Sequence, residues 1–210
     1  MIRVLIADDH AVVRLGLKQI LSETMDLTIA GEASNGFEVL EMVREDQYDV
    51  IVLDITMPGM SGLDVLKQLK AEFPSLPVLI LSMHSEEQYA VRALKAGAAG
   101  YLTKDRAPEE LVSAINLLSQ GRRYVTSSLA EKLAIALDMD SQKMPHELLS
   151  DREYQVLCFI GQGKTITQIS EELHLSAKTI STYRARILQK MKMTNNAELI
   201  RYVLKNKLLE

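Results

Sequence analysis

Short apolar runs alternate with stretches of mixed polarity over the first 121 residues of the chain. Five runs have the continuous apolar character of strands buried on both faces of a sheet. These predicted strands are Val4–Ala7, Leu27–Gly31, Val50–Leu53, Val78–Leu81 and Gly100–Leu102. The stretches that follow them carry apolar residues at three- and four-residue spacing, which predicts helices. These predicted helices are Val12–Glu23, Gly36–Arg44, Gly62–Glu72, Glu87–Lys95 and Pro108–Gln120. Their strict alternation predicts an α/β fold with a flavodoxin-like, doubly wound, five-stranded parallel sheet in the order 2-1-3-4-5.

The pattern changes towards the end of the chain, where no strand is predicted. Ser150 followed three residues later by Glu153 is a capping box, which marks the start of a helix. The turn from His174 to Ser176 is short, and Ser176 caps the helix after it, as expected of a helix-turn-helix. The four predicted helices are 151–161, 166–173, 177–191 and 196–206.

The segment between these two patterns has features of a linker. One apolar-spaced stretch, Leu129–Leu137, predicts a further helix, whereas Asp138–Glu147 is polar and has no period. The sequence therefore predicts an α/β domain at 1–121, a linker with a helix at 122–147 and an all-α helix-turn-helix domain at 148–210.

The charge is divided unevenly between the two predicted domains. The whole chain has 24 Lys and Arg against 28 Asp and Glu, a net charge of −4. Residues 148–210 hold ten basic and six acidic residues, or +4, so residues 1–147 carry −8. The basic tail is thus the part that is able to meet a polyanion.

Two further observations bear on location. The single cysteine, Cys158, excludes internal disulfides and cysteine-rich zinc sites, and it points to the reducing cytoplasm. No apolar run approaches the roughly 18 residues of a membrane span, and the first residues lack the layout of a signal peptide, so no membrane partner is expected.

Carboxylates follow two of the predicted strands. Asp8 and Asp9 follow the first strand, and Asp54 follows the third, with Met57-Pro58-Gly59 forcing a turn soon after it. The predicted strand order makes these two strands neighbours, so the three acids should meet at one edge of the sheet. Such a cluster repels itself unless a proton or a cation neutralises it, and an all-oxygen site of this kind suits Mg²⁺.

A hydroxyl and an ammonium group are predicted at the same edge. Ser82 follows the fourth strand and Lys104 follows the fifth. Beside three acids and a divalent cation, they form a site for holding a phosphoryl group on a carboxylate, with Asp54 as nucleophile and Lys104 offsetting charge on the transferring oxygens. The alternative is a set of solvated, unrelated strand-end residues, which the number of suitable groups disfavours.

The third helix of the tail has two different faces. Ile180, Ile187 and Met191 share one face, which should be core. The opposite face is cationic, and the helix has no carboxylate between residues 177 and 191, as a helix inserted into a DNA groove requires. This face consists of Lys178, Thr182, Ala185, Arg186 and Gln189. Arg184 lies near the buried flank and should extend outward to a phosphate. The alternative is the solvated basic face of a small bundle.

The chain resembles the NarL/FixJ-type (LuxR-type) response regulators of two-component systems over essentially its full length. In residues 1–121 the matching features are Asp8-Asp9, Asp54 with Met57-Pro58-Gly59 and Gly62, Ser82, Tyr101 and Lys104. In the tail they are Leu149–Glu153, Gly161–Lys164, Ile169-Ser170 and Leu175–Ile180. Lys104 precedes Asp105, where many receivers carry a proline with a cis peptide bond, so the resemblance does not carry that bond over.

The resemblance implies a phosphorylation switch. Asp54 would accept phosphate from a histidine kinase, with Mg²⁺ held by Asp9, Asp54 and the backbone carbonyl of Thr56, and with Asp8 acting through water. Ser82 and Tyr101 would be the switch pair, Tyr101 turning inward on phosphorylation, and Lys104 would hold the phosphate. No enzyme activity is expected beyond Mg²⁺-dependent self-phosphorylation and self-dephosphorylation of Asp54.

The resemblance also implies that the tail binds double-stranded DNA, and that the chain forms a homodimer when phosphorylated. The expected DNA contacts are Lys178, Thr179, Thr182, Tyr183, Arg184, Arg186 and Lys190. Tyr183 stands where many relatives have histidine. On the last helix, an apolar arc that includes Val203 is wide enough to supply a dimer contact, although the whole arc could instead pack into its own domain.

Several alternatives remain open from the residues alone. His10 is expected to start the first helix, since imidazole suits Mg²⁺ poorly, and His84 could overhang the phosphate or lie exposed in a loop. The same carboxylates could serve a small aspartyl-phosphate phosphatase, although the tail does not supply the substrate-covering cap that such an enzyme needs. The output domain could also dock a protein in place of DNA.

Overall fold

The computed structural model describes residues 1–83, 86–126, 129–130, 144–206 and 208–209 of the 210-residue chain. Compact units divide between Leu133 and Ala134, and the two units are described separately below. Most of the predicted helix Leu129–Leu137 and most of the predicted linker Asp138–Glu147 lie outside the described residues, as does His84.

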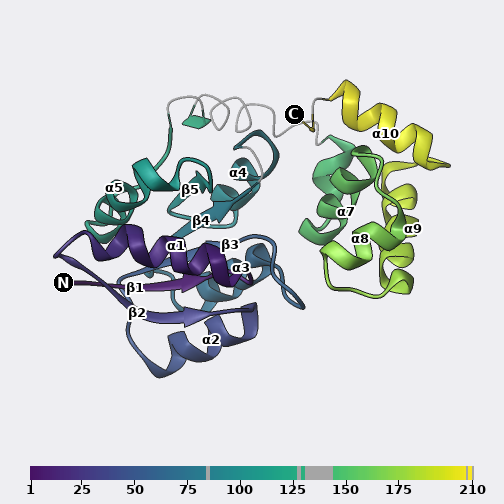
Figure 1. Cartoon of the computed structure of the whole chain (residues 1–210). Helices are drawn as coiled ribbons and strands as arrows, with labels where there is room; N and C mark the ends of the chain where they lie inside the picture. The colour runs from purple at the N-terminus through teal and green to yellow at the C-terminus, as the bar shows by residue number, and fades with distance from the viewer. Residues whose placement is uncertain (84–85, 127–128, 131–143, 207, 210) are drawn as a thin grey trace. The chain divides into compact units, whose positions relative to one another are not determined.

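Unit 1 contains a five-stranded parallel sheet with the strand order β2-β1-β3-β4-β5, which confirms the predicted topology (Figure 1). The strands are β1 (Ile2–Ala7), β2 (Leu27–Ala33), β3 (Val50–Asp54), β4 (Val78–Ser82) and β5 (Gly100–Thr103). Every residue of β3 and β4 is buried. This burial explains their uninterrupted apolar sequence, because a strand covered by helices on both faces has no solvent-facing side.

Helices follow the strands in alternation. They are α1 (Ala11–Ser22), α2 (Gly36–Glu45), α3 (Gly62–Glu72), α4 (Glu86–Lys95) and α5 (Ala107–Ser119). α1 and α5 pack against each other and share a core with one face of the sheet, while α2 and α3 pack together (Figure 1). The predicted boundaries differ from these by no more than one residue, except at the ends of the outer strand β2 and of β1.

Unit 2 is helical throughout its described part, as predicted. Its described part begins with a short 3-10 turn, η1 (Pro145–Leu148), most of which lies inside the stretch that the sequence assigned to linker. The α-helices that follow are α7 (Asp151–Gly161), α8 (Ile166–Glu172), α9 (Ala177–Met191) and α10 (Asn196–Lys205). The capping box of Ser150 and Glu153 is present at the start of α7. Local capping chemistry thus accounts for where the first helix of this unit begins.

α8, the turn after it and α9 form the predicted helix-turn-helix. The core of the unit includes Ile169 of α8 together with Ile180, Ile187 and Met191 of α9, which confirms the face predicted to be core. No helix within the described ranges has the length and apolar character needed to cross a bilayer.

Candidate phosphoacceptor site and nucleic-acid interface

The carboxyl ends of the central strands bring the predicted acids together. Asp8 and Asp9 follow β1, and Asp54 is the last residue of β3, whose pairing with β1 places Ala7 opposite Leu53. Asp8 and Asp54 are almost completely buried, and one side-chain ligand atom from each of Asp8, Asp9, His10 and Asp54 lies within 4.8 Å of the others.

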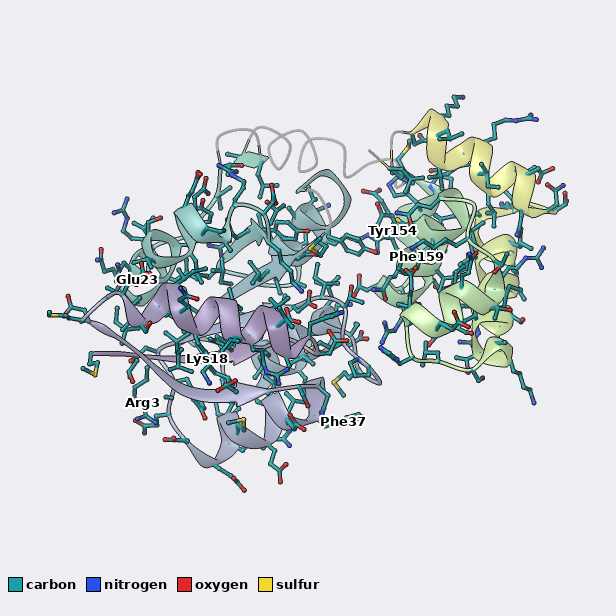
Figure 2. The ribbon with its side chains drawn as sticks, viewed as in Figure 1. Arg3, Lys18, Glu23, Phe37, Tyr154 and Phe159 are labelled. Atoms are coloured by element: carbon teal, nitrogen blue, oxygen red, sulfur yellow. The ribbon has the colours of Figure 1, made fainter. Side chains whose placement is uncertain are left out.

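Glycine 62 allows the chain to turn closely around Asp54. A Cβ atom on Gly62 would lie 1.9 Å from the Asp54 carbonyl oxygen, so only glycine fits at this first position of α3. The Gly62 N–H donates to the carbonyl of Ile55 at 2.9 Å. Gly59, in the loop between them, has a φ of +75° and is covered by Phe37, whose ring lies exposed at the start of α2 (Figure 2). The two glycines of the motif after Asp54 are therefore required by the backbone, Gly59 for its positive φ and Gly62 for its close approach to Asp54.

Lys104 bridges two of the acids. Its Nζ lies 2.6 Å from Asp8 Oδ2 and 3.0 Å from Asp54 Oδ2. Burial opposes the charge on this ammonium group, but the carboxylates of Asp54 and Asp8 outweigh it and raise the pKa of Lys104. Lys104 therefore stays charged and offsets part of the negative charge of the cluster.

One lysine cannot neutralise three acids. Burial raises the pKa of Asp54 to about 7, with Lys104 opposing the rise and Asp8 adding to it. Asp54 Oδ1 is buried and has no hydrogen-bond partner within the described part of the chain. A carboxylate that is short of a partner, with two neighbouring acids, fits a hard divalent cation, and Mg²⁺ suits oxygen ligands of this kind. The acids present thus fit a Mg²⁺ site, and the expected ligand set of Asp9, Asp54 and the Thr56 carbonyl stays a prediction.

Without Mg²⁺, the raised pKa of Asp54 predicts a pH-dependent stability. Between about pH 4 and 7 the folded protein holds a proton that the unfolded chain releases, so the free energy of unfolding should fall as pH rises through this range. Each pKa unit corresponds to about 1.4 kcal/mol. Asp54→Asn, which is neutral and similar in shape, should flatten the dependence. Thermal unfolding of both proteins at pH 5 and pH 8 in EDTA measures the difference, and equal slopes would contradict the burial of a protonated Asp54.

The predicted switch residues lie at the expected strands. Ser82 ends β4 and Tyr101 lies in β5, and both are fully buried. The prediction that Tyr101 turns inward on phosphorylation therefore needs correction, because its side chain already lies inside. A rearrangement of this pair would have to occur within the core. The peptide bond after Lys104 is not cis.

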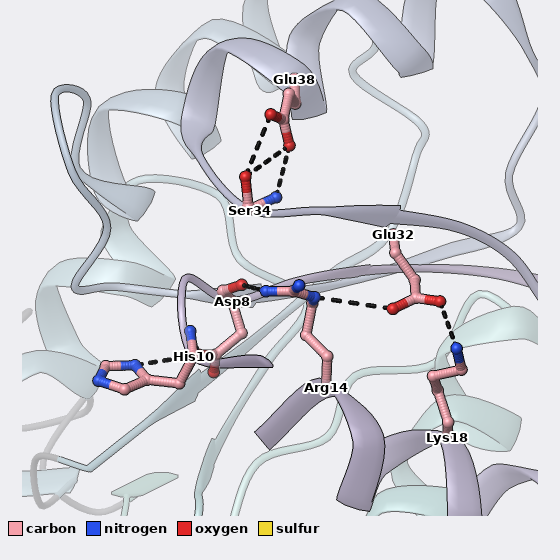
Figure 3. Close-up of polar contacts among 7 residues, drawn as sticks. All are labelled: Asp8, His10, Arg14, Lys18, Glu32, Ser34 and Glu38. Atoms are coloured by element: carbon pink, nitrogen blue, oxygen red, sulfur yellow. Dashed lines mark hydrogen bonds and ion pairs between the residues drawn. The ribbon is translucent and has the colours of Figure 1, made fainter. Parts of the chain in front are cut away.

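His10 and Arg14 also contact the loop that carries Asp8 and Asp9, and Glu32 contacts Arg14, although none of the three was predicted to act at this site. His10, which was expected to start the first helix, occupies the cap position just before α1, and its Nδ1 lies 2.7 Å from Asp9 Oδ1. Arg14 Nη1 donates to the carbonyl oxygen of Asp8 at 2.6 Å, and Glu32 Oε2 lies 3.6 Å from Arg14 Nε (Figure 3). The sequence held one signal of this network. Arg14 and Lys18 stand four residues apart on one helix, where like charges repel unless an acid lies between them.

The exposed face of α9 has the predicted composition. Lys178, Thr182, Ala185, Arg186 and Gln189 are all exposed. Within the described residues, Lys178 and Arg186 form no ion pair with a carboxylate, so both cations are available to phosphates or bases. Thr179 and Tyr183 are partly buried, and the Thr179 N–H donates to the Ser176 hydroxyl oxygen at 3.0 Å, which caps the helix.

Two predicted phosphate contacts are already held within unit 2. Arg184 is partly buried, and its Nε donates to Asn196 Oδ1 at 2.6 Å. Lys190 Nζ lies 2.6 Å from Glu153 Oε2 at the start of α7. Their contact with DNA stays a prediction, and each would have to share its remaining donors with a phosphate.

The structure corrects the prediction of a dimer contact through Val203 on α10. Val203, which was considered for a dimer contact, is completely buried, and a Cβ on Gly161 would lie 2.5 Å from its Cγ1. Val203 therefore packs into its own unit against the end of α7. The large apolar residue that α10 leaves exposed is Leu204, at 62%.

Comparisons with known proteins agree with both parts of this geometry. Residues 4–116 match the response regulator receiver domain family, and residues 147–203 match the luxR family of bacterial regulatory proteins. The chain is 36% identical over 200 residues to the response regulator UvrY of Escherichia coli, covering 95% of this chain and 92% of UvrY. It is 38% identical over 200 residues to the response regulator GacA of Pseudomonas viridiflava, covering 95% and 94% of the two chains.

A solved structure of similar fold is RcsB from Salmonella enterica serovar Typhimurium, bound to promoter rprA in the presence of the phosphomimetic BeF3⁻. Its TM-score is 0.64 at 27% identity, covering 97% of this chain and 98% of RcsB. The likeness therefore extends over both units.

Proposed function

The chain belongs to the two-component response regulators of the NarL/FixJ type, which join a receiver domain to a LuxR-type DNA-binding domain, and we propose that phosphorylation of Asp54 controls its binding to DNA. Membership of this family makes the chain a regulator of transcription. We propose in addition which residues form the switch, which class of protein donates the phosphate and which helix forms the dimer contact.

The observation that carries the proposal is the bridge from Lys104 to both Asp8 and Asp54. A lysine at 2.6 Å and 3.0 Å from two buried carboxylates has a charge that the cluster needs before phosphorylation. The same ammonium group can then bind a phosphoryl oxygen on Asp54. A merely structural ion pair would require one acid, whereas this lysine has two beside it and a third, Asp9, close by.

Phosphoryl transfer to Asp54 uses groups already present. A carboxylate oxygen of Asp54 forms a bond to phosphorus while the bond from phosphorus to the donor breaks and the donor keeps that electron pair. Mg²⁺, held by Asp9, Asp54 and the Thr56 carbonyl, would neutralise charge on the transferring oxygens. Lys104 binds one of those oxygens, and the Ser82 hydroxyl donates a hydrogen bond to another. A histidine kinase is the proposed donor, and the chain catalyses only the gain and loss of its own phosphoryl group.

The output of the switch is proposed to be DNA binding by α9. Lys178 and Thr182 lie near its amino-terminal end, which is the part that reaches base edges in helix-turn-helix proteins. RcsB has been solved bound to a promoter with a phosphomimetic, which supports both a DNA partner and its link to phosphorylation. We propose that the protein acts in the reducing cytoplasm, because its proposed partner is DNA and its single cysteine is a free thiol.

Dimerisation through α10 gives a testable prediction. One module of this size buries too little surface for tight specific binding, so a two-fold pair on adjacent half-sites is expected. Leu204→Asp should reduce two chains per DNA site to one, because it puts a charge on the apolar residue that α10 exposes. Sedimentation of the phosphorylated full-length protein with a palindromic site measures the stoichiometry.

Leu15→Asp is the matched control, since Leu15 is 66% exposed on α1 of the receiver. Two chains per site for Leu15→Asp and one for Leu204→Asp is the expected result. The reverse pattern would assign the dimer contact to the receiver domain and remove it from α10.

A salt series tests the DNA output against its alternatives. Phosphorylated full-length protein should shift mixed genomic DNA, and the logarithm of the binding constant should fall linearly with the logarithm of salt concentration. An aspartyl-phosphate phosphatase or a protein-docking output domain predicts no shift at any salt concentration. Failure to bind any DNA at low salt would thus overturn the proposed output.

A further inference from the structure

Arg14 differs from the other cation at the acidic cluster in what it contacts. Lys104 pairs with the carboxylates of Asp8 and Asp54, whereas Arg14 Nη1 donates to the backbone carbonyl oxygen of Asp8 at 2.6 Å (Figure 3). The Arg14 side chain is only 19% exposed. Its charge therefore lies near the acids, but its hydrogen bond to the Asp8 carbonyl holds the backbone of the loop that carries them.

That carbonyl belongs to the peptide unit that joins Asp8 to Asp9. Because a peptide unit is planar, holding its carbonyl oxygen fixes ψ of Asp8 and φ of Asp9 together. These two angles set the direction of the Asp9 side chain from the backbone, and with it the region that the carboxylate can reach. The remaining groups of Asp8 are also held: its N–H donates to the carbonyl of Ala33 at 3.1 Å, and its Oδ1 accepts from the His10 N–H at 2.8 Å.

The helix after the loop does not supply this fixation by itself. His10 occupies the cap position of α1 and makes no side-chain cap hydrogen bond. The contact of the Asp9 carboxylate with His10 uses a ring that is 65% exposed. Arg14 comes from the following turn of α1, and its own N–H donates to the His10 carbonyl at 3.1 Å, so it connects the rigid helix to the loop.

Glu32 orients the guanidinium group from the neighbouring strand. Its Oε2 lies 3.6 Å from Arg14 Nε, and its Oε1 lies 2.6 Å from Lys18 Nζ. The carboxylate thus relieves the repulsion between two cations one turn apart and holds the Arg14 guanidinium group between Asp8 and Glu32 (Figure 3).

We propose that Arg14 is a positioning residue for Mg²⁺, which acts through the Asp8–Asp9 peptide unit to aim the Asp9 carboxylate into the phosphoacceptor site. The inference rests on the proposed function, because it deepens the role of the same site. A purely electrostatic role for Arg14 would have the opposite effect on the affinity for Mg²⁺ when Arg14 is removed. By Coulomb's law alone, removing a cation beside three acids would strengthen the binding of Mg²⁺. Loss of positioning would weaken it.

Calorimetric titration of the full-length protein with Mg²⁺, in the absence of any phosphodonor, tests the inference. Arg14→Ala should raise the Mg²⁺ dissociation constant about 10-fold or more, as expected when a residue that orients a metal ligand is lost. Labelling by acetyl phosphate should shift to higher Mg²⁺ concentration by the same factor and recover most of its rate at saturation. Lys18→Ala is the matched control, because it removes a cation bound to the same Glu32 without touching the loop. Its Mg²⁺ affinity should stay within about 2-fold of wild type.

The outcomes separate this inference from the proposed function. If wild type binds no Mg²⁺ and takes up no phosphate, the proposed function itself fails. If wild type binds Mg²⁺ and Arg14→Ala binds it equally well or more tightly, the positioning role is overturned. Thermal unfolding of Arg14→Ala in EDTA accompanies the titration. A variant that has lost its unfolding transition is replaced by Glu32→Gln, which should weaken Mg²⁺ binding in the same direction, and unchanged affinity there would also overturn the role.

Discussion

Replacing Asp54 with alanine is expected to abolish labelling of the full-length chain by acetyl phosphate and Mg²⁺. Asp54 ends a buried strand, its Oδ2 contacts Lys104 at 3.0 Å, and its burial raises its pKa to about 7. Asp8 is also buried beside Lys104, but its Oδ1 already accepts a hydrogen bond from the His10 N–H, whereas Asp54 Oδ1 has no hydrogen-bond partner among the described residues. Asp54 is therefore the expected nucleophile. Intact-protein mass spectrometry should detect one phosphoryl group per wild-type chain and none on Asp54→Ala.

Two further variants make this result specific. Asp26→Ala, which removes an exposed acid before β2, should label as wild type does. Asp9→Ala should lose most of the labelling rate together with its dependence on Mg²⁺, because a ligand of the cation is missing. Undiminished labelling of Asp54→Ala would assign the phosphoacceptor to a different residue.

Lys178→Ala is expected to weaken binding to a specific DNA site by about 1–3 kcal/mol, or roughly 5- to 150-fold, if this side chain reads a base. Lys178 is exposed in the first turn of α9, and its side chain forms no ion pair within the described residues. Loss of a base contact should leave binding to random DNA much less affected. Fluorescence anisotropy on a specific site and on a scrambled site of equal length measures both constants.

Arg186→Ala is the matched comparison on the same exposed face. It should weaken specific and random DNA alike and should reduce the salt slope by about 1, because a phosphate contact carries no sequence information. If Lys178→Ala also loses equally on both DNAs, it is a backbone contact and the assignment of base reading is wrong.

The sheet and the position of the acids could be predicted because each depends on local pattern. A strand buried on both faces must be apolar throughout, as Val50–Leu53 are, and the alternation of strands and helices leaves few possible strand orders. With the order known, Asp8 and Asp54 must lie at one edge. The caps at Ser150 and Ser176 are equally local, since each side chain bonds a backbone N–H three residues later.

The features that were missed depend on contacts between segments that are distant in the sequence. Arg14 meets Asp8 and Glu32 only after α1 has packed beside β2, and no spacing rule encodes that pairing. Val203 belongs to an arc wider than one interface needs, so the sequence could not decide which member is buried. The ends of α8 and α9, by contrast, were predicted to within one residue, although the residues that follow them, His174 and Lys192, have φ of 50° and 55° and are not glycine.

The most direct test of the central claim is the DNA affinity of full-length protein measured as phosphate is added to Asp54. Samples incubated with acetyl phosphate and Mg²⁺ for increasing times are divided between mass spectrometry and anisotropy on one DNA site at fixed salt. In wild type, affinity should rise in step with the phosphorylated fraction. Ser82→Ala should take up phosphate but gain little affinity, since its hydroxyl can no longer bond the phosphoryl group. A fully phosphorylated wild-type protein that binds DNA no more tightly than the unphosphorylated protein would contradict the account.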